Sequence, residues 1–347
     1  MKKVAVALSG GVDSSLTVLL LRDAGYEVVG VTLRVQKNRS GASVCAGDDA
    51  VEKARAVAAY LGIEHRVCDV CDAFRTSILV PSWETYSQGR TPSPCVRCNE
   101  RIKFGKLFEF ALSLGCEKMA TGHYARIVDY HGTPRIARGA DRNKDQSYFL
   151  SGLTNEVVSR IMFPLGEYEK PKVRALADSY GLPSAHTPDS QNVCITEPGK
   201  TFSETLCDLF DGKPKIGQFI YDGKKLGSHL GIHHYTVGQR HGLGNLIPTQ
   251  KAYVKAIVGN DVEITADVSS LDTRHLRAKD VIWHAPVPAE GVYAQIRYRS
   301  PAVPCRVTCA GDVVSVEFES PVHAVTPGQI VAFYDGDVTI GRGIIDG

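Results

Sequence analysis

The stretch VAVALSGGVDSSLTVLLL, residues 4–21, decides the fold of the first part of this chain. Five apolar residues run directly into a turn that carries Gly10 and Gly11, and an apolar helical segment follows. Two glycines let the backbone turn tightly and approach a ligand, while the first turn of the helix presents unpaired N–H groups. This order of strand, turn and helix predicts a site for an anion, above all a phosphate.

The loop at residues 9–15 contains no lysine. It therefore does not match the phosphate loop G-x-x-x-x-G-K-[ST], and its spacing also differs from G-x-G-x-x-G. We expect the donors to be backbone N–H groups and the hydroxyls of Ser9, Ser14 and Ser15, with the carboxylate of Asp13 available to orient Mg²⁺. The residues alone also allow an ordinary helix start, in which Asp13 or Ser14 is the N-terminal cap.

The seven residues from Ser9 to Ser15 together resemble the pyrophosphate loop (PP-loop) of the ATP-pyrophosphatase family. Enzymes of that family use ATP to adenylate an oxygen atom and release pyrophosphate. The resemblance therefore implies ATP and Mg²⁺ as cofactors.

Length and composition limit the number of domains, the cellular location and the kind of chemistry that we expect. A chain of 347 residues predicts two or three domains. No apolar run reaches about 18 residues and no signal-peptide pattern precedes the first strand, so we expect no membrane and a cytoplasmic location. The net charge of +2 neither requires nor excludes nucleic acid. Ten cysteines in this setting favour thiol or metal chemistry over a disulfide scaffold.

Strands and helices alternate in the first half of the chain. Apolar runs at 27–33, 65–70 and 118–123 predict strands, and helical periodicity appears at 49–61 and 104–112. Gly62 and Gly115 follow the two helical segments and are expected to end them. This alternation predicts a doubly wound parallel sheet.

Ligands of such sheets bind beyond the carboxyl ends of the strands. The loop at residues 9–15, Leu33 and Gly122 with His123 should therefore converge on one crevice. By its residue type alone, Leu33 fits the core better than a contact with adenine, and a role for His123 stays open.

From about Gly212 the pattern changes to short apolar runs separated by Gly, Asp and Pro turns. The runs at 218–221, 253–258 and 313–318 are typical of all-β structure. We therefore expect an α/β domain at 1–210, a small central β domain at 211–275 and a C-terminal β-barrel at 276–347.

Two thiols lie in the segment TPSPCVRCN, residues 91–99, just before the predicted helix at 104–112. A thiol near a helix N-terminus beside Arg97 is expected to have a lowered pKa and thiolate character at neutral pH. Cys95 or Cys98 would then act as a nucleophile. A third thiol, Cys194, follows about one hundred residues later.

A metal site is the competing interpretation of the cysteines. Cys68 and Cys71 form a second C-x-x-C pair, which suggests a four-cysteine zinc site. Cys68 lies in a predicted strand, however, and the two side chains should then point to opposite faces. Cys95, Cys98 and Cys194 are a better set, suited to a 4Fe-4S cluster with one open iron.

Further blocks extend the resemblance over nearly the whole chain, which is similar to the tRNA-specific 2-thiouridylases. These blocks are Gly89–Pro94 leading to Cys98-Asn99, Ile102–Phe104, Ala120–Tyr124, Lys144–Leu150, Asp189-Ser190 leading to Cys194, Tyr235–Arg240 with Gly242–Gly244, and Thr326–Gln329. The family implies ATP-dependent replacement of the 2-oxygen of the wobble uridine by sulfur, in tRNAs for Lys, Glu and Gln.

The resemblance also implies roles for individual residues. Cys98 matches the nucleophile and Cys194 the cysteine that carries a persulfide. The positions that match ATP contacts are Ala7, Leu8, Ser9, Gly10, Gly11, Val12, Asp13, Ser14, Leu33 and Gly122. The segment Ser93, Pro94 and Cys95 matches the contact with the target base, and the positions that match other tRNA contacts are Lys144, Asp145, Gln146, Arg297 and Tyr298.

The implied chemistry is consistent with these residues. Adenylation makes the uracil oxygen a leaving group, and sulfur released from the Cys194 persulfide by Cys98 then attacks the ring, which leaves a Cys98–Cys194 disulfide. A cysteine desulfurase or a sulfur-relay protein would load Cys194. A splayed wobble base would stack on an aromatic ring, for which Tyr124, Tyr148, Phe149 and Tyr298 are candidates.

Two departures from the family pattern keep alternatives open. Many relatives carry Asp at the position of Cys95 and Asn at that of Ser93, so a third thiol stands where a carboxylate is usual. This favours thiolation through a 4Fe-4S cluster on Cys95, Cys98 and Cys194. The remaining alternatives are a PP-loop synthetase that adenylates a small molecule and a zinc-stabilised RNA-binding module without catalysis.

Overall fold

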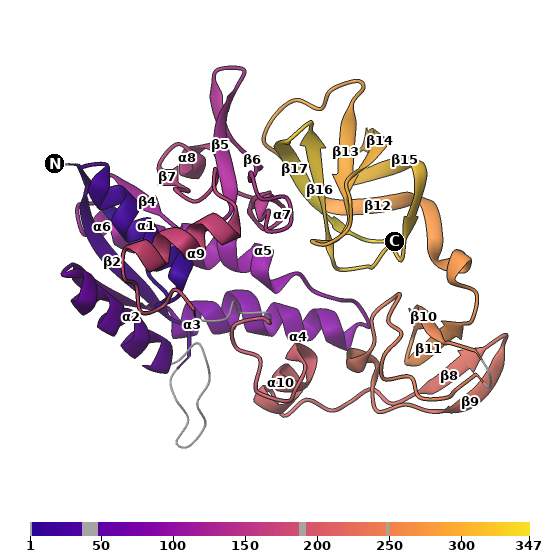
Figure 1. The fold of residues 1–347 in the computed structure, drawn as a ribbon. Helices are drawn as coiled ribbons and strands as arrows, with labels where there is room; N and C mark the ends of the chain where they lie inside the picture. The colour runs from indigo at the N-terminus through magenta and orange to yellow at the C-terminus, as the bar shows by residue number, and fades with distance from the viewer. Residues whose placement is uncertain (1, 37–47, 187–191, 248–249) are drawn as a thin grey trace. The chain divides into compact units, whose positions relative to one another are not determined.

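A computed structural model describes residues 2–36, 48–186, 192–247 and 250–347 (Figure 1). The chain divides into two compact units. Unit 1 consists of residues 1–78, 95–196 and 337–339, and unit 2 of residues 79–94, 197–336 and 340–347.

A five-stranded sheet with strand order β3-β2-β1-β4-β7 forms the centre of unit 1. Its strands are β1 (Lys3–Ala7), β2 (Glu27–Arg34), β3 (Glu64–Asp69), β4 (Lys118–Ala120) and β7 (Ile161–Met162). All of its pairings are parallel, with Ala7 opposite Val31 and Val6 opposite Ala120. The expected parallel sheet is therefore confirmed.

Amphipathic helices pack against this sheet because their apolar faces complete its core. The main helices are α1 (Val12–Asp23), α2 (Asp48–Leu61) and α9 (Lys170–Ser179). Val4, Val6 and Leu16 are almost fully buried in one cluster with Ala54, Ala58 and Val173 from these helices. Helices α1 and α9 lie side by side (Figure 1).

A continuous helical run follows residue 93. It consists of α5 (Pro94–Cys98), the π-helical segment η2 (Asn99–Leu107) and α6 (Phe108–Ser113). Phe104, Leu107, Phe108 and Ala111 are buried, as the periodicity predicts. Gly62 and Gly115 follow α2 and α6 with φ of 62° and 77°, a left-handed conformation that glycine adopts without strain.

Smaller elements complete unit 1. They are α3 (Cys71–Phe74), the π-helical segment η1 (Arg75–Leu79), the antiparallel hairpin of β5 (Ala125–Tyr130) and β6 (Thr133–Arg138), α7 (Ser147–Leu150) and α8 (Asn155–Val158). Val338, at the start of β17, pairs with Ala137 of β6.

The described residues of unit 2 form two β structures and two α-helices. The helices are α4 (Val80–Ser87) and α10 (Phe202–Leu209), and a four-stranded sheet is formed by β10 (Tyr253–Val258), β11 (Asp261–Thr265), β8 (Gln218–Tyr221) and β9 (Lys224–Ser228). Short 3₁₀ segments cover Ile232–His234 and Val268–Leu271. The runs predicted at 218–221 and 253–258 coincide with β8 and β10.

The remaining strands form the expected barrel. They are β12 (Asp272–Trp283), β15 (Val313–His323), β14 (Val303–Ala310), β13 (Val292–Gln295), β16 (Ile330–Asp335) and β17 (Val338–Ile345), in that spatial order. Pairing of β12 with β17, with Ala278 opposite Ile345, closes the barrel. Among the described residues, no helix has both the length and the apolarity to cross a membrane.

Candidate functional site

The glycine loop is a tight, well-braced turn between β1 and α1. Gly10 has φ of 79°, and a Cβ atom there would stand 3.0 Å from the backbone of Lys53 in α2. The Ser14 hydroxyl donates to the Gly11 carbonyl at 3.0 Å and accepts from the Ser9 N–H at 3.2 Å. The serine side chains therefore stabilise the turn itself.

The first turn of α1 has no side-chain cap among the described residues. Gly11 is the N-cap residue, and the helix already begins at Val12. Asp13 and Ser14 lie inside α1, so the interpretation of either as the cap is wrong. The N–H groups of the first turn have no partner four residues earlier in the helix, which makes them available to an anion.

The expected ATP-site residues converge at the carboxyl ends of neighbouring strands. Gly122 comes two residues after β4, and a Cβ atom on it would lie 2.9 Å from the Asp13 backbone. Leu33 lies near the end of β2, half-buried. The loop and Gly122 are thus in direct contact, and Leu33 is on the adjacent strand.

The carboxylate of Asp13 is bound from two sides. Lys170 Nζ, at the start of α9, donates to both Asp13 oxygens at 2.8 Å. The Tyr124 hydroxyl donates to Oδ1 at 2.7 Å. The Lys170 side chain is 9% exposed, whereas that of Asp13 is 31% exposed. Neither partner of Asp13 was expected from the sequence.

His123 is a packed aromatic residue. Its ring lies between Phe104 and Phe163, with centroid separations of 5.9 and 5.8 Å. Burial, together with the charge of Lys103, holds the pKa of His123 well below its usual range. The ring is therefore neutral, and its Nδ1 lies 2.6 Å from the Thr121 hydroxyl.

The expected thiolate character of the α5 cysteines is wrong. Burial raises the pKa of Cys98 to about 12 and also raises the pKa of Cys95, and the opposing charge of Lys103 does not offset it. Arg97 is exposed, and the cation that acts on both thiols is Lys103. Desolvation of a thiol by the surrounding protein outweighs the attraction of a single cation here.

Cys194 and Cys98 belong to the same unit, and Cys194 adds to the rise in the pKa of Cys98 that burial causes. Cys194 is exposed, and none of the nine cysteines in the described ranges forms a disulfide. Asp189 to Gln191, which precede it, lie outside the described residues. Cys95, Cys98 and Cys194 do not come together as a metal-ligand group, and no other three His, Cys, Asp or Glu side chains do so in the part of the chain that the structure describes.

Two of the tRNA-contact positions expected in unit 1 bond to the protein itself. The Asp145 carboxylate is buried and accepts from Arg138 and from the Gly139 N–H, at 3.1 and 2.9 Å. Gln146 Oε1 accepts from the Tyr124 N–H at 3.0 Å. Lys144, next to them, is half-buried.

The expected tRNA positions in unit 2 are likewise embedded. Arg297 donates to the carbonyls of Val237 and Ala324 at 2.7 and 2.8 Å and also to the Thr326 hydroxyl. The Tyr298 carbonyl accepts from Gln295 Nε2 at 2.9 Å. Arg297 therefore ties three loops of unit 2 together.

The segment expected to meet the target base is anchored to the barrel. The Ser93 hydroxyl accepts from the Ile330 N–H at 3.2 Å, and Gln329 Nε2 donates to the Pro92 carbonyl at 2.7 Å. Ser93 and Pro94 belong to unit 2, whereas Cys95 belongs to unit 1.

Two of the four aromatic candidates for base stacking are inaccessible. Tyr124 and Tyr148 are only 3% and 2% exposed, so the expectation that they stack on a base is wrong. Phe149 and Tyr298 are half-buried.

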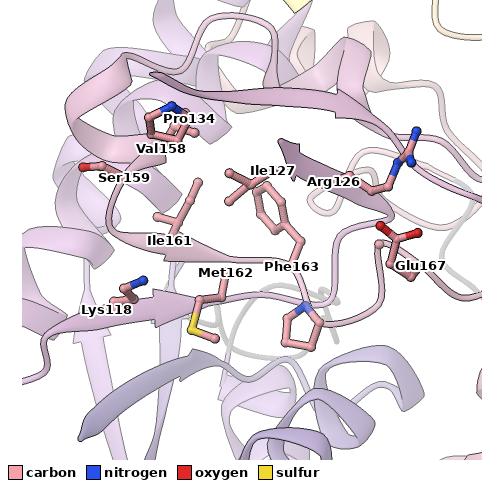
Figure 2. Close-up of a pocket in the computed structure, with 12 residues that line it drawn as sticks. Lys118, Arg126, Ile127, Pro134, Val158, Ser159, Ile161, Met162, Phe163 and Glu167 are labelled. Carbon is pink, nitrogen blue, oxygen red and sulfur yellow. The ribbon is translucent and has the colours of Figure 1, made fainter. Parts of the chain in front are cut away.

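A separate pocket of about 460 Å³ lies between β7 and the β5–β6 hairpin (Figure 2). Apolar side chains such as Ile127, Ile161 and Phe163 line it, with Arg126 and Glu167 at one side. None of the predicted site residues lines this pocket.

Three family models match the chain. The tRNA methyl transferase HUP domain matches residues 2–198, the tRNA methyl transferase PRC-barrel domain residues 212–265, and the aminomethyltransferase beta-barrel domain residues 273–345. A solved 4-thiouridine synthetase–RNA complex with bound ATP is 16% identical, with a TM-score of 0.36 over 61% of this chain and 50% of that one.

Relatives that match the chain over almost their full length have much higher sequence identity to it. The tRNA-specific 2-thiouridylase MnmA of Trichormus variabilis is 40% identical over 100% of this chain and 99% of its own length. Those of Carboxydothermus hydrogenoformans and Heliobacterium modesticaldum are 41% and 42% identical, over 99% of this chain and 98% and 92% of their own lengths. The chain therefore belongs to the tRNA-specific 2-thiouridylase (MnmA) family.

Proposed function

We propose that the chain uses ATP to replace the 2-oxygen of the wobble uridine of tRNAs for Lys, Glu and Gln by sulfur. The observation that carries the proposal is the pairing of two features in unit 1. An uncapped glycine loop offers N–H groups to a phosphate, and the same unit holds both Cys98 and Cys194, which contributes to the raised pKa of Cys98. The names of the full-length relatives support the same activity.

The proposed reaction transfers two groups: the adenylyl group of ATP to the uracil O2, and then sulfur to the ring C2. The uracil O2 attacks the α-phosphate of ATP, and pyrophosphate leaves. The Cys98 thiol attacks the inner sulfur of the Cys194 persulfide and passes its proton to the departing outer sulfur. This forms a Cys98–Cys194 disulfide and releases hydrogen sulfide, which ionises to hydrosulfide. Hydrosulfide attacks the ring C2, and AMP leaves with the former O2. A cellular thiol then reduces the disulfide, and a cysteine desulfurase or sulfur-relay protein supplies the next sulfur in the cytoplasm.

The ATP site would be formed by residues 7–14 with Leu33 and Gly122. Mg²⁺ fits this site, because a carboxylate offers about four lone-pair positions and Asp13 uses three of them for Lys170 and Tyr124. The remaining position on Oδ2 is a hard oxygen donor of the kind that Mg²⁺ prefers. When bound, Mg²⁺ would neutralise charge on the leaving pyrophosphate.

The tRNA would meet Ser93 to Cys95 with its target base, and Lys144 to Gln146 and Arg297-Tyr298 elsewhere. The side chains of Asp145, Gln146 and Arg297 already bond within the protein. Such bonds hold the segments in a fixed shape, which suits recognition of RNA by shape.

A 4Fe-4S cluster on Cys95, Cys98 and Cys194 is the second candidate route, favoured by the unusual third thiol. Cys95 acts electrostatically on Cys98, as Cys194 does. The three side chains do not form a ligand group in the described structure, so the present arrangement does not fit the cluster.

Release of AMP and pyrophosphate from ATP, measured with and without unmodified tRNA, tests the proposal. We expect tRNA-dependent release from the wild type and from Cys98→Ser, and 2-thiouridine from the wild type but not from Cys98→Ser. Cys309→Ser, on the exposed surface of the barrel, is the matched control and should retain both activities. Turnover of ATP without tRNA would point to a small-molecule synthetase, and no turnover at all to a binding module.

A further inference from the structure

The glycine loop lacks the lysine that other phosphate loops carry, and the structure brings a lysine to it from elsewhere. Lys170 lies 157 residues after Asp13 in the sequence. Its ammonium group donates to both carboxylate oxygens of Asp13 at 2.8 Å and lies 5.6 Å from the centre of the Tyr124 ring. We define Asp13, Lys170 and Tyr124 as the Asp13 cluster.

Backbone hydrogen bonds to Asp141 and Gln146 hold Lys170 and Tyr124 in place. The backbone N–H of Lys170 donates to the buried Asp141 carboxylate at 2.9 Å, so the start of α9 is held in place. Tyr124 is held by Gln146, which accepts from its N–H at 3.0 Å and donates its own N–H to the Tyr124 carbonyl at 2.8 Å. Both donors to Asp13 are therefore rigid.

The three members of the Asp13 cluster differ in their exposure to solvent. The Lys170 side chain is 9% exposed and Tyr124 as a whole is 3% exposed, whereas the Asp13 side chain is 31% exposed. The lysine and the tyrosine thus form the inner layer, and the carboxylate is the member that solvent and ligand reach. Asp13 lies in the first turn of α1, whose N–H groups are the expected phosphate donors.

Stability alone does not account for a buried lysine at this place. Lysine is almost never buried unless paired, and a buried ion pair is often no more stabilising than apolar residues of similar size. The pair does, however, fix the position of the Asp13 carboxylate, because Lys170 binds both of its oxygens. Fixed polar groups are what a site needs when charge moves onto a leaving phosphate.

We infer that Lys170 is a positioning residue of the ATP site. With Tyr124 it holds Asp13, and through Asp13 the first turn of α1, in the arrangement that receives the pyrophosphate end of Mg²⁺-bound ATP. The inference rests on the proposed use of ATP and adds a residue that lies outside the loop and outside every predicted site position.

Equilibrium dialysis with Mg²⁺ and radiolabelled ATP tests this directly, because it needs neither tRNA nor a sulfur donor. Lys170→Met removes two charge-assisted hydrogen bonds and should weaken ATP binding by about 100-fold. Lys170→Arg keeps the charge and should recover most of the affinity. Tyr124→Phe removes one bond to Asp13 and should weaken binding by about 10-fold. Lys172→Met is the matched control, since Lys172 is exposed on the same helix and contacts Tyr168 instead.

A purely structural role predicts a different pattern. The urea midpoint of Lys170→Met would then fall while the ATP affinity of the folded fraction stayed that of the wild type. This result overturns the inference. Unchanged ATP affinity in Lys170→Met with a wild-type midpoint overturns it as well, as does a wild-type protein that binds no ATP. ATP binding that depends on Lys170, in a protein that makes no 2-thiouridine, supports the inference and contradicts the proposed function.

Discussion

Gly122 lies against Asp13 with no space for a side chain. A Cβ atom on Gly122 would stand 2.9 Å from both the carbonyl carbon and the Cβ atom of Asp13, and 3.0 Å from the Ser14 nitrogen. Real Cβ atoms essentially never approach backbone atoms this closely. The end of β4 and the start of α1 therefore keep their contact only because residue 122 is glycine.

Gly122→Ala should displace the first turn of α1 and weaken ATP binding by about 10-fold or more, because the phosphate donors lie in that turn. Equilibrium dialysis with Mg²⁺ and ATP measures this, and a near-wild-type urea midpoint would show that the fold survives. An alanine variant with wild-type ATP affinity would contradict the role of this contact.

The raised pKa of Cys98 predicts slow alkylation at neutral pH. A thiol with a pKa of about 12 stays protonated below that value, and only the thiolate reacts. In iron-free protein, the rate of Cys98 alkylation by iodoacetamide should rise about tenfold per pH unit from pH 7 to pH 10. Peptide mass spectrometry gives the rate for each cysteine. A rate that levels off below pH 8 would show that Cys98 is a thiolate near neutral pH, as the neighbouring Arg97 led us to expect, and would contradict the raised pKa.

Lys103 is the cation that acts on that thiol, so its removal tests the same electrostatics. Lys103→Met should slow Cys98 alkylation at pH 8.5, because the positive charge of Lys103 lowers the pKa of Cys98 and its loss leaves less thiolate. Lys106→Met, on the same helical run and paired with Glu109 at 2.9 Å, serves as the control and should leave the rate unchanged. Equal rates in both variants would show that Lys103 does not influence the thiol.

Arg297→Ala should destabilise unit 2, because the guanidinium bonds to three acceptors, one at Val237 and two in the loop that carries Ala324 and Thr326. Hydrogen bonds to charged groups contribute about 1.5–3 kcal/mol each, so a loss of about 3 kcal/mol in the free energy of unfolding is expected. Arg299→Ala, two residues away and exposed, should change it by less than about 0.5 kcal/mol. Weakened tRNA binding by Arg297→Ala with an unchanged urea midpoint would instead indicate a direct contact with tRNA.

His233 predicts acid sensitivity of unit 2. Burial lowers the pKa of His233 to about 4, with His234 and His229 acting in the same direction and Glu204 against it. The folded-state pKa lies below the ordinary value of 6.5, so the unfolded chain binds the proton first as the pH falls. Stability is therefore complete above about pH 6.5 and declines from there towards pH 4.

Urea unfolding at pH 7.5 and pH 5 measures that decline. His233→Phe keeps an aromatic ring against Trp83, whose ring centroid is 5.5 Å from that of His233, and should show a smaller loss between the two pH values. His241→Gln, at an exposed position, should behave as the wild type. An equal loss in all three proteins would assign the acid sensitivity to other groups.

Much of the fold follows from local sequence pattern. Apolar runs and helix-ending glycines located β1, β2, α2 and β10 because those signals depend on neighbours along the chain. The same reasoning located the glycine loop. It could not find Lys170, since one lysine at the start of a helix has no local signal and its partner is 157 residues away. It also gave the wrong pKa direction for Cys98, because tertiary burial outweighs the charges nearby in sequence.

Formation of 2-thiouridine by iron-free, chelator-treated protein is the most direct test of the proposed function. The protein is supplied with unmodified tRNA, ATP, Mg²⁺ and a cysteine desulfurase, and compared with the same protein after anaerobic cluster reconstitution. We expect 2-thiouridine from the iron-free wild type, and none from Cys98→Ser or Cys194→Ser. Product only after reconstitution would contradict the persulfide route, and product from neither preparation would contradict the thiolation itself.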